Sequence, residues 1–170
     1  TDDLTTQNQG NVSHGIVTSI AEHAMVNRWD DATTSGVTPE HNGEYGVILM
    51  NRKNAGLGDV GVNAAYDAAY IFSATGDTCT SGAETGCNAD ISNSSNNLFI
   101  GALDDTGNAI HSESAGPGVY QDLYLLAPTI DGYGSDPTKN AAAVVGGATL
   151  LLMEKFDWTG RQAAERLKDT

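Results

Sequence analysis

Two cysteines are the residues of this sequence whose type and spacing most directly suggest chemistry. Cys79 and Cys87 are separated by seven residues, a spacing that a small surface disulfide could close. Two free thiols are the alternative, and without a CxxC motif neither zinc nor a thioredoxin-like site is indicated.

The remaining polar motifs predict no cofactor and no metal site. The histidines His23, His41 and His111 have no ligand-like spacing with one another or with acids. The segment 104–108 (DDTGN) could hold Ca²⁺, but it matches no full EF-hand loop and a plain turn is the simpler interpretation. The pair Gly146-Gly147 lies inside a helical pattern, which indicates close packing of a helix on a sheet and not a phosphate loop.

Composition narrows the class of protein. Acids outnumber bases 22 to 8, which gives a formal net charge of −14 and argues against nucleic acid and against a polybasic membrane anchor. No apolar run reaches the roughly 18 residues that span a bilayer, so no membrane insertion is expected. The 20 glycines and many Thr, Ser and Asn residues favour a loop-rich protein that is secreted or on the cell surface. Because the chain begins at Thr1 without an initiator Met, we expect a mature or excised piece.

Apolar patterns divide the chain into a flexible lead-in, residues 1–13, and a single domain, residues 14–170. Spacing of three and four residues predicts helices, and short continuous apolar runs predict strands that are buried on both faces. The expected helices are 14–26, 62–69, 141–156 and one from Thr159, where T-x-x-Q fits a capping box. The expected strands are 45–50, 70–75, 98–103, 123–127 and a returning strand at 109–113. This alternation predicts an α/β fold, with a three-layer, mostly parallel sheet flanked by helices.

Several segments, in order, resemble the subtilisin-like serine peptidases (subtilases), above all their secreted and autotransporter branch. His14-Gly15-Ile16-Val17 is similar to the family's H-G-T-x-V-A at the catalytic histidine. The other similar segments are YGVILMN (45–51), YIFSATGD (70–77), NLFIGALDDTGNAIHSESAGPG (97–118), LYLLAPTIDGYG (123–134), PTKNAAAVVGGATLLLMEKF (137–156) and WTGRQAAERLKDT (158–170). The resemblance implies a partial subtilisin-like fold and descent from a serine endopeptidase.

The same resemblance implies that the peptidase machinery is incomplete. It places Lys139 where the family has its nucleophilic serine, and Asp77 where the family has the asparagine of the oxyanion hole. The thirteen residues before His14 leave no room for the strand that carries the family's catalytic aspartate. A carboxylate at Asp77 would repel the negative charge that develops during acyl transfer, so the peptidase reaction is not expected.

Lys139 and His14 have two interpretations each. Lys139 could be a nucleophile, because desolvation and the positive end of a helix disfavour its ammonium form, or it could be paired with Asp77 or Asp136. His14 could be the family's general base, or simply a polar residue of a helix.

Three functions follow as hypotheses. The first is a catalytically inactive subtilase-like domain that serves as a structural or binding module of a secreted or cell-surface assembly. Another chain, another copy or the rest of its own polypeptide would then cover the truncated edge of the sheet. The alternative is a fragment of an active subtilisin-like serine endopeptidase, with a nucleophile among Ser112, Ser114 and Ser135. The third is a small-molecule binding domain that uses the former substrate cleft.

Overall fold

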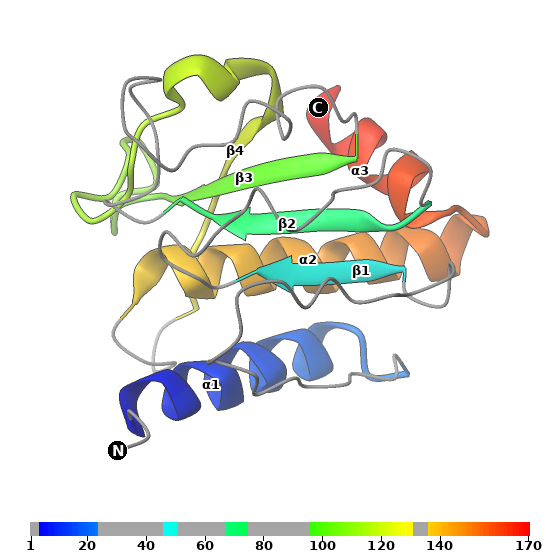
Figure 1. The fold of residues 1–170 in the computed structure, drawn as a ribbon, viewed down its shortest axis with the longest axis horizontal. Helices are drawn as coiled ribbons and strands as arrows, with labels where there is room; N and C mark the ends of the chain where they lie inside the picture. The colour runs from blue at the N-terminus through cyan, green and yellow to red at the C-terminus, as the bar shows by residue number, and fades with distance from the viewer. Residues whose placement is uncertain (1–3, 24–45, 51–66, 75–95, 131–135) are drawn as a thin grey trace, which may run out of the picture.

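The computed structural model describes residues 4–23, 46–50, 67–74, 96–130 and 136–170. Within these ranges one parallel sheet is combined with three α-helices (Figure 1). The elements are α1 (Leu4–Ile20), β1 (Val47–Met50), β2 (Ala69–Ser73), β3 (Asn97–Ala102), the 3₁₀-helix η2 (Gly118–Leu123), β4 (Tyr124–Ala127), α2 (Pro137–Phe156) and α3 (Gly160–Lys168).

The sheet confirms the predicted α/β class. Its four strands lie in the order β1-β2-β3-β4, and each neighbouring pair is parallel. Each of the four apolar runs that predicted strands contains one, and the observed ends differ from the predicted ends by at most two residues. The described α-helices pack on one face of the sheet (Figure 1). No described α-helix packs on the opposite face, so the expected third layer stays a prediction.

The core lies between the sheet and α2. Alternate residues of each strand point to the same face of a sheet, so one face of β2 and β3 presents Ile71, Leu98 and Ile100. All three are fully buried against Ala141 and Ala142 of α2. The remaining buried members of this cluster are Ala69, Ala102, Ala127, Val145 and Ala164. The small side chains of α2 let its backbone approach the strands closely.

The second face of the sheet is also apolar and buried. It carries Tyr70, Phe72 and Phe99, each no more than 4% exposed. Phe72 and Phe99 are register partners on neighbouring strands, and their rings stack with centroids 5.1 Å apart. Burial on both faces explains why these strands are continuous apolar runs and do not alternate with polar residues.

Helix α1 differs from its prediction. It begins at Leu4 and ends at Ile20, so the prediction of a helix over 14–26 was wrong at both ends, and residues 4–13, expected as a flexible lead-in, are helical. The reason is that the apolar stripe starts before His14, at Val12, and continues at Ile16 and Ile20 with helical spacing. These side chains pack against α2, and such packing stabilises helices beyond their intrinsic propensity.

Gly147 sets the distance between α1 and α2. A Cβ atom added at Gly147 would lie 2.8 Å from Cβ and 2.9 Å from Cγ2 of Ile20. At the neighbouring Gly146 an added Cβ would meet Val17 at 3.7 Å and Ile71 at 3.9 Å, which are ordinary contacts. The glycine pair therefore does serve close packing, but the tight contact is with the helix α1 and not with the sheet.

Three further predictions are corrected by the structure. The returning strand at 109–113 is reduced to one antiparallel bridge between Leu103 and Ile110, because a turn follows directly. Of the helix expected at 62–69, residues 62–66 lie outside the described residues, and Ala69 already begins β2. The helix expected over 141–156 begins earlier, at Pro137.

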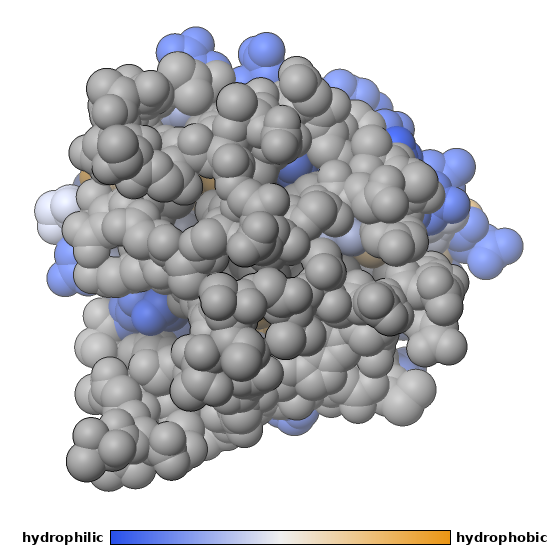
Figure 2. Space-filling view, in the orientation of Figure 1, coloured by the Kyte–Doolittle hydropathy of each residue, from blue (hydrophilic) through white to orange (hydrophobic). Residues whose placement is uncertain are grey.

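Helix α3 confirms the predicted capping box. The backbone N–H of Gln162 donates to Thr159 Oγ1 at 3.3 Å, and the backbone N–H of Thr159 donates to Gln162 Oε1 at 2.9 Å. The outer face of α3 is exposed. In Figure 2, hydrophilic side chains stand at the edge of the molecule where α3 lies.

The two glycines of α2 give a matched stability test. Gly146→Ala should leave stability unchanged or raise it, because alanine is favoured over glycine in a helix by about 1 kcal/mol. Gly147→Ala gains the same propensity but must push Ile20 away, and such overpacking costs about 1–3 kcal/mol. Urea unfolding followed by circular dichroism should therefore rank Gly147→Ala as the less stable variant. Equal free energies of unfolding would contradict the close contact between α1 and α2.

Candidate functional site

The carboxyl ends of the four strands and the first turn of α2 lie at the same end of the molecule. In Figure 1 the strand arrows point toward the side on which α2 begins. Open parallel sheets bind ligands at the carboxyl ends of their strands, so this end is the candidate site by fold. Its described side chains include Lys139 in the first turn of α2 and Asp136 directly before the helix.

Asp136 caps the helix and holds Lys139. The carboxylate accepts hydrogen bonds from Thr138 Oγ1 at 2.7 Å and from the backbone N–H of Lys139 at 3.1 Å. The second carboxylate oxygen lies 3.0 Å from Lys139 Nζ, and both side chains are largely shielded, with 17% of Lys139 and 22% of Asp136 exposed. Of the two partners considered from the sequence, the structure shows Asp136. An ammonium held in this way has no lone pair to offer an acyl carbon.

Two opposing effects act on the pKa of Asp136. Burial disfavours its charged form and alone would raise the pKa, but the hydrogen bonds from Thr138 and Lys139 and the Lys139 charge outweigh burial. The pKa of Asp136 is therefore lowered, and the carboxylate is the form that the folded protein stabilises.

His14 is not joined to Lys139. It lies within α1 with an exposed side chain, and its backbone carbonyl accepts a hydrogen bond from Thr18 Oγ1 at 2.9 Å. The helices α1 and α2 run side by side in the same direction (Figure 1). Within the described ranges, however, no hydrogen bond or ion pair links His14 with Lys139. The arrangement gives His14 no partner for general-base catalysis among these residues.

The other candidate residues divide into two groups. Asp77, Cys79, Cys87, His41 and Ser135 lie outside the described residues, so the oxyanion position and the disulfide stay predictions. Ser112 is exposed, whereas Ser114 Oγ accepts a hydrogen bond from the backbone N–H of Ala102 at 2.8 Å. Ser114 thereby ties the segment after the 104–108 turn to the end of β3, which is a structural role.

The Asp104 turn is held by its own hydrogen bonds. Thr106 Oγ1 donates to the carboxylate at 2.9 Å, and the backbone N–H groups of Asn108 and Ala109 donate at 3.1 and 3.2 Å. These bonds, that from Thr106 first, lower the pKa of Asp104. Gly107 has φ +71°, which glycine adopts without the strain that other residues meet there. Over the described part of the chain, no group of three His, Cys, Asp or Glu side chains is placed to hold a metal ion.

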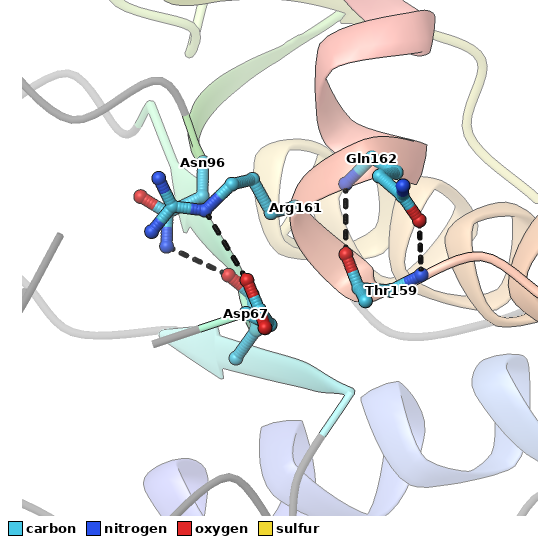
Figure 3. Close-up of polar contacts among 6 residues, drawn as sticks. Asp67, Asn96, Thr159, Arg161 and Gln162 are labelled. Carbon is cyan, nitrogen blue, oxygen red and sulfur yellow. Dashed lines mark hydrogen bonds and ion pairs between the residues drawn. The ribbon is translucent and has the colours of Figure 1, made fainter. Parts of the chain in front are cut away.

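A second polar cluster lies at the amino ends of the strands (Figure 3). The backbone N–H of Arg161 donates to the Asp67 carbonyl at 2.8 Å, and Arg161 Nε lies 3.7 Å from Asp67 Oδ1. The buried Asn96 donates from Nδ2 to the Ala68 carbonyl at 2.8 Å. The Arg161–Asp67 contacts join α3 to the segment before β2, and the Asn96 bond joins the starts of β2 and β3.

The sequence analysis above did not identify Asp136 as the N-cap of α2, nor Thr138 as a donor to its carboxylate. Asp before Pro at the start of a helix is a known signal, because Asp accepts hydrogen bonds at the N-cap and Pro fits the first helical position. This Asp-Pro signal indicates a helix that begins at Pro137, with Lys139 in its first turn.

Comparisons with known proteins add no relative. No protein-family model matches the chain, and no curated protein matches it. Among the helices in the described ranges, none is long and apolar enough to cross a membrane.

The Asp136 cap predicts a pH-dependent stability. Asp136→Ala should lower the free energy of unfolding by about 0.5–2 kcal/mol at neutral pH, because it removes the N-cap. Asp136→Asn keeps a capping oxygen but loses the charge. Since the folded pKa is lowered, the charge stabilises the protein above the unfolded pKa, and this stability disappears as pH falls through the folded pKa.

Urea unfolding from neutral pH down to about pH 2 checks this expectation. The gap between the native protein and Asp136→Asn should close at the acidic end. Asp105→Asn, which removes a charge from an exposed turn residue, is the control and should show little difference. A gap between native and Asp136→Asn proteins that is the same at every pH would contradict the role of the carboxylate.

Proposed function

We propose that the chain is a catalytically inactive subtilase-like domain that acts as a structural or binding module. The observation that carries the proposal is the ion pair between Lys139 and Asp136 at the start of α2. In the resemblance described above, Lys139 stands where a nucleophile would be needed. A capped, ion-paired lysine stabilises the helix terminus and leaves no activated group there.

The position of His14 supports the same proposal. A serine-peptidase histidine must contact the nucleophile on one side and an aspartate on the other. His14 is exposed on α1 and makes neither contact within the described ranges. Its retention therefore fits descent from a peptidase better than present catalysis.

The edge strand β1 suggests how such a module is used. In the described sheet β1 pairs with β2 on one side, and an open strand edge must be covered to avoid uncontrolled pairing. We propose that another protein chain or another copy of this chain covers that edge. The acidic charge and the Gly-, Thr- and Asn-rich composition fit a secreted or cell-surface setting.

Labelling with a fluorophosphonate probe, read by intact mass, tests the proposal. The probe adds one defined mass to an activated serine and does not react with an ion-paired lysine. We expect no adduct under conditions in which subtilisin labels fully. A stoichiometric adduct would support the alternative, a fragment of an active serine endopeptidase. The Ser112→Ala and Ser114→Ala variants would then show whether either residue is the nucleophile.

A further inference from the structure

Helix α2 begins directly after an aspartyl–prolyl peptide bond, the one Asp-Pro pair in the sequence. Acid breaks peptide bonds of this type more easily than others, because the aspartate side chain can attack its own carbonyl carbon. Proline assists the break, since its ring nitrogen carries no N–H in the chain and leaves as a secondary amine. The bond between Asp136 and Pro137 therefore has an intrinsic reactivity on which the folded structure acts.

The first turn of α2 holds both groups that would react. Oδ1 of Asp136 accepts hydrogen bonds from Thr138 Oγ1 at 2.7 Å and from the backbone N–H of Lys139 at 3.1 Å. Oδ2 lies 3.0 Å from Lys139 Nζ. The carbonyl oxygen of Asp136 accepts the first helical hydrogen bond, from the backbone N–H of Asn140 at 3.1 Å. A carboxylate oxygen that turned back to the Asp136 carbonyl carbon would have to break these contacts.

Protonation of Asp136 would loosen these contacts and supply the reactive carboxyl group at the same time. Burial alone would raise the pKa of Asp136, but the hydrogen bonds from Thr138 and Lys139 and the Lys139 charge outweigh it and lower the pKa. The folded chain therefore keeps the carboxylate, and with it the ion pair, to lower pH than the unfolded chain keeps its carboxylate. Folding and protection of the bond are thus coupled through one side chain.

We propose that the Asp136–Pro137 bond is an acid-triggered scission site that the intact first turn of α2 protects. In the reaction, a carboxyl oxygen of Asp136 bonds to the Asp136 carbonyl carbon, and the bond from that carbon to the Pro137 nitrogen breaks. The carboxyl proton passes to this nitrogen, which becomes the amine of a new amino terminus. Water then opens the cyclic anhydride, restores the side-chain carboxyl group and leaves a new carboxyl terminus at Asp136.

Scission at this bond would divide the fold. It separates residues 1–136, which contain the four described strands, from residues 137–170, which contain α2 and α3. The second fragment carries Ala141 and Ala142, which fill the core beneath the sheet. The inference goes beyond the proposed function and does not depend on it, since it concerns a bond of the chain and not a ligand or a partner.

Intact mass spectrometry of the full chain in acid tests the proposal. The protein is kept at the lowest pH at which circular dichroism still shows the native helix content, with and without urea. We expect fragments 1–136 and 137–170, whose masses add up to that of the chain plus one water. They should form at least about tenfold faster in urea, because the unfolded chain lacks the contacts of the first turn.

Two matched variants separate the contacts of Asp136 from general stability. Thr138→Val keeps the shape of the side chain but removes a donor to Asp136, and it should speed scission about fivefold without urea and leave the rate in urea unchanged. Thr106→Val removes the corresponding donor to the Asp104 carboxylate, and it should change the rate less than about twofold.

Asp136→Glu tests the chemistry itself. Glutamate keeps a carboxyl group, but its longer side chain closes a larger ring and attacks the carbonyl carbon less readily, so the two fragments should not form even in urea. Equal rates for the native protein with and without urea would overturn the proposal, as would fragments that divide at another bond. Scission of the Asp136→Glu variant at the native rate, or equal effects of Thr138→Val and Thr106→Val, would overturn it as well.

Discussion

The burial of α2 is the constraint on which the rest of the described structure depends. Ala141, Ala142 and Ala143 have no exposed surface, and the helix packs against the sheet on one side and against α1 on another. Such close approach is possible because α2 presents alanines and glycines where larger residues would hold the layers apart. Because both faces of the parallel sheet are buried, a helix of this kind must cover one of the two faces.

The same helix positions the polar groups of the candidate site. Its first turn brings Asp136, Thr138 and Lys139 to the carboxyl ends of the strands, where hydrogen bonds and an ion pair occupy the polar groups. Its last turn ends at Phe156, whose ring stacks on Trp158, and Asp157 caps the helix with its backbone N–H donating to the Met153 carbonyl. The amino end of α2 is internally satisfied, which fits the proposal of a module without an activated lysine.

Patterns that reflect local chemistry were predictable from the sequence, and features set by tertiary contacts were not. The four strands in apolar runs and the Thr159 capping box follow from short motifs, and all are confirmed. The start of α1 was missed because its stability comes from packing on α2. The pairing of Lys139 was left open between Asp77 and Asp136, since sequence alone does not say which acid lies nearer.

Native-state amide hydrogen exchange, followed by NMR, tests the central role of α2 most directly. The buried amides of Ala142, Val145 and Thr149 should exchange only through global unfolding, with a free energy equal to that from urea unfolding. Amides of α1 should exchange at lower free energy, because that helix packs mainly on α2. The account would be contradicted if the α2 amides exchanged at lower free energy than those of β2 and β3, since the sheet would then persist without the helix.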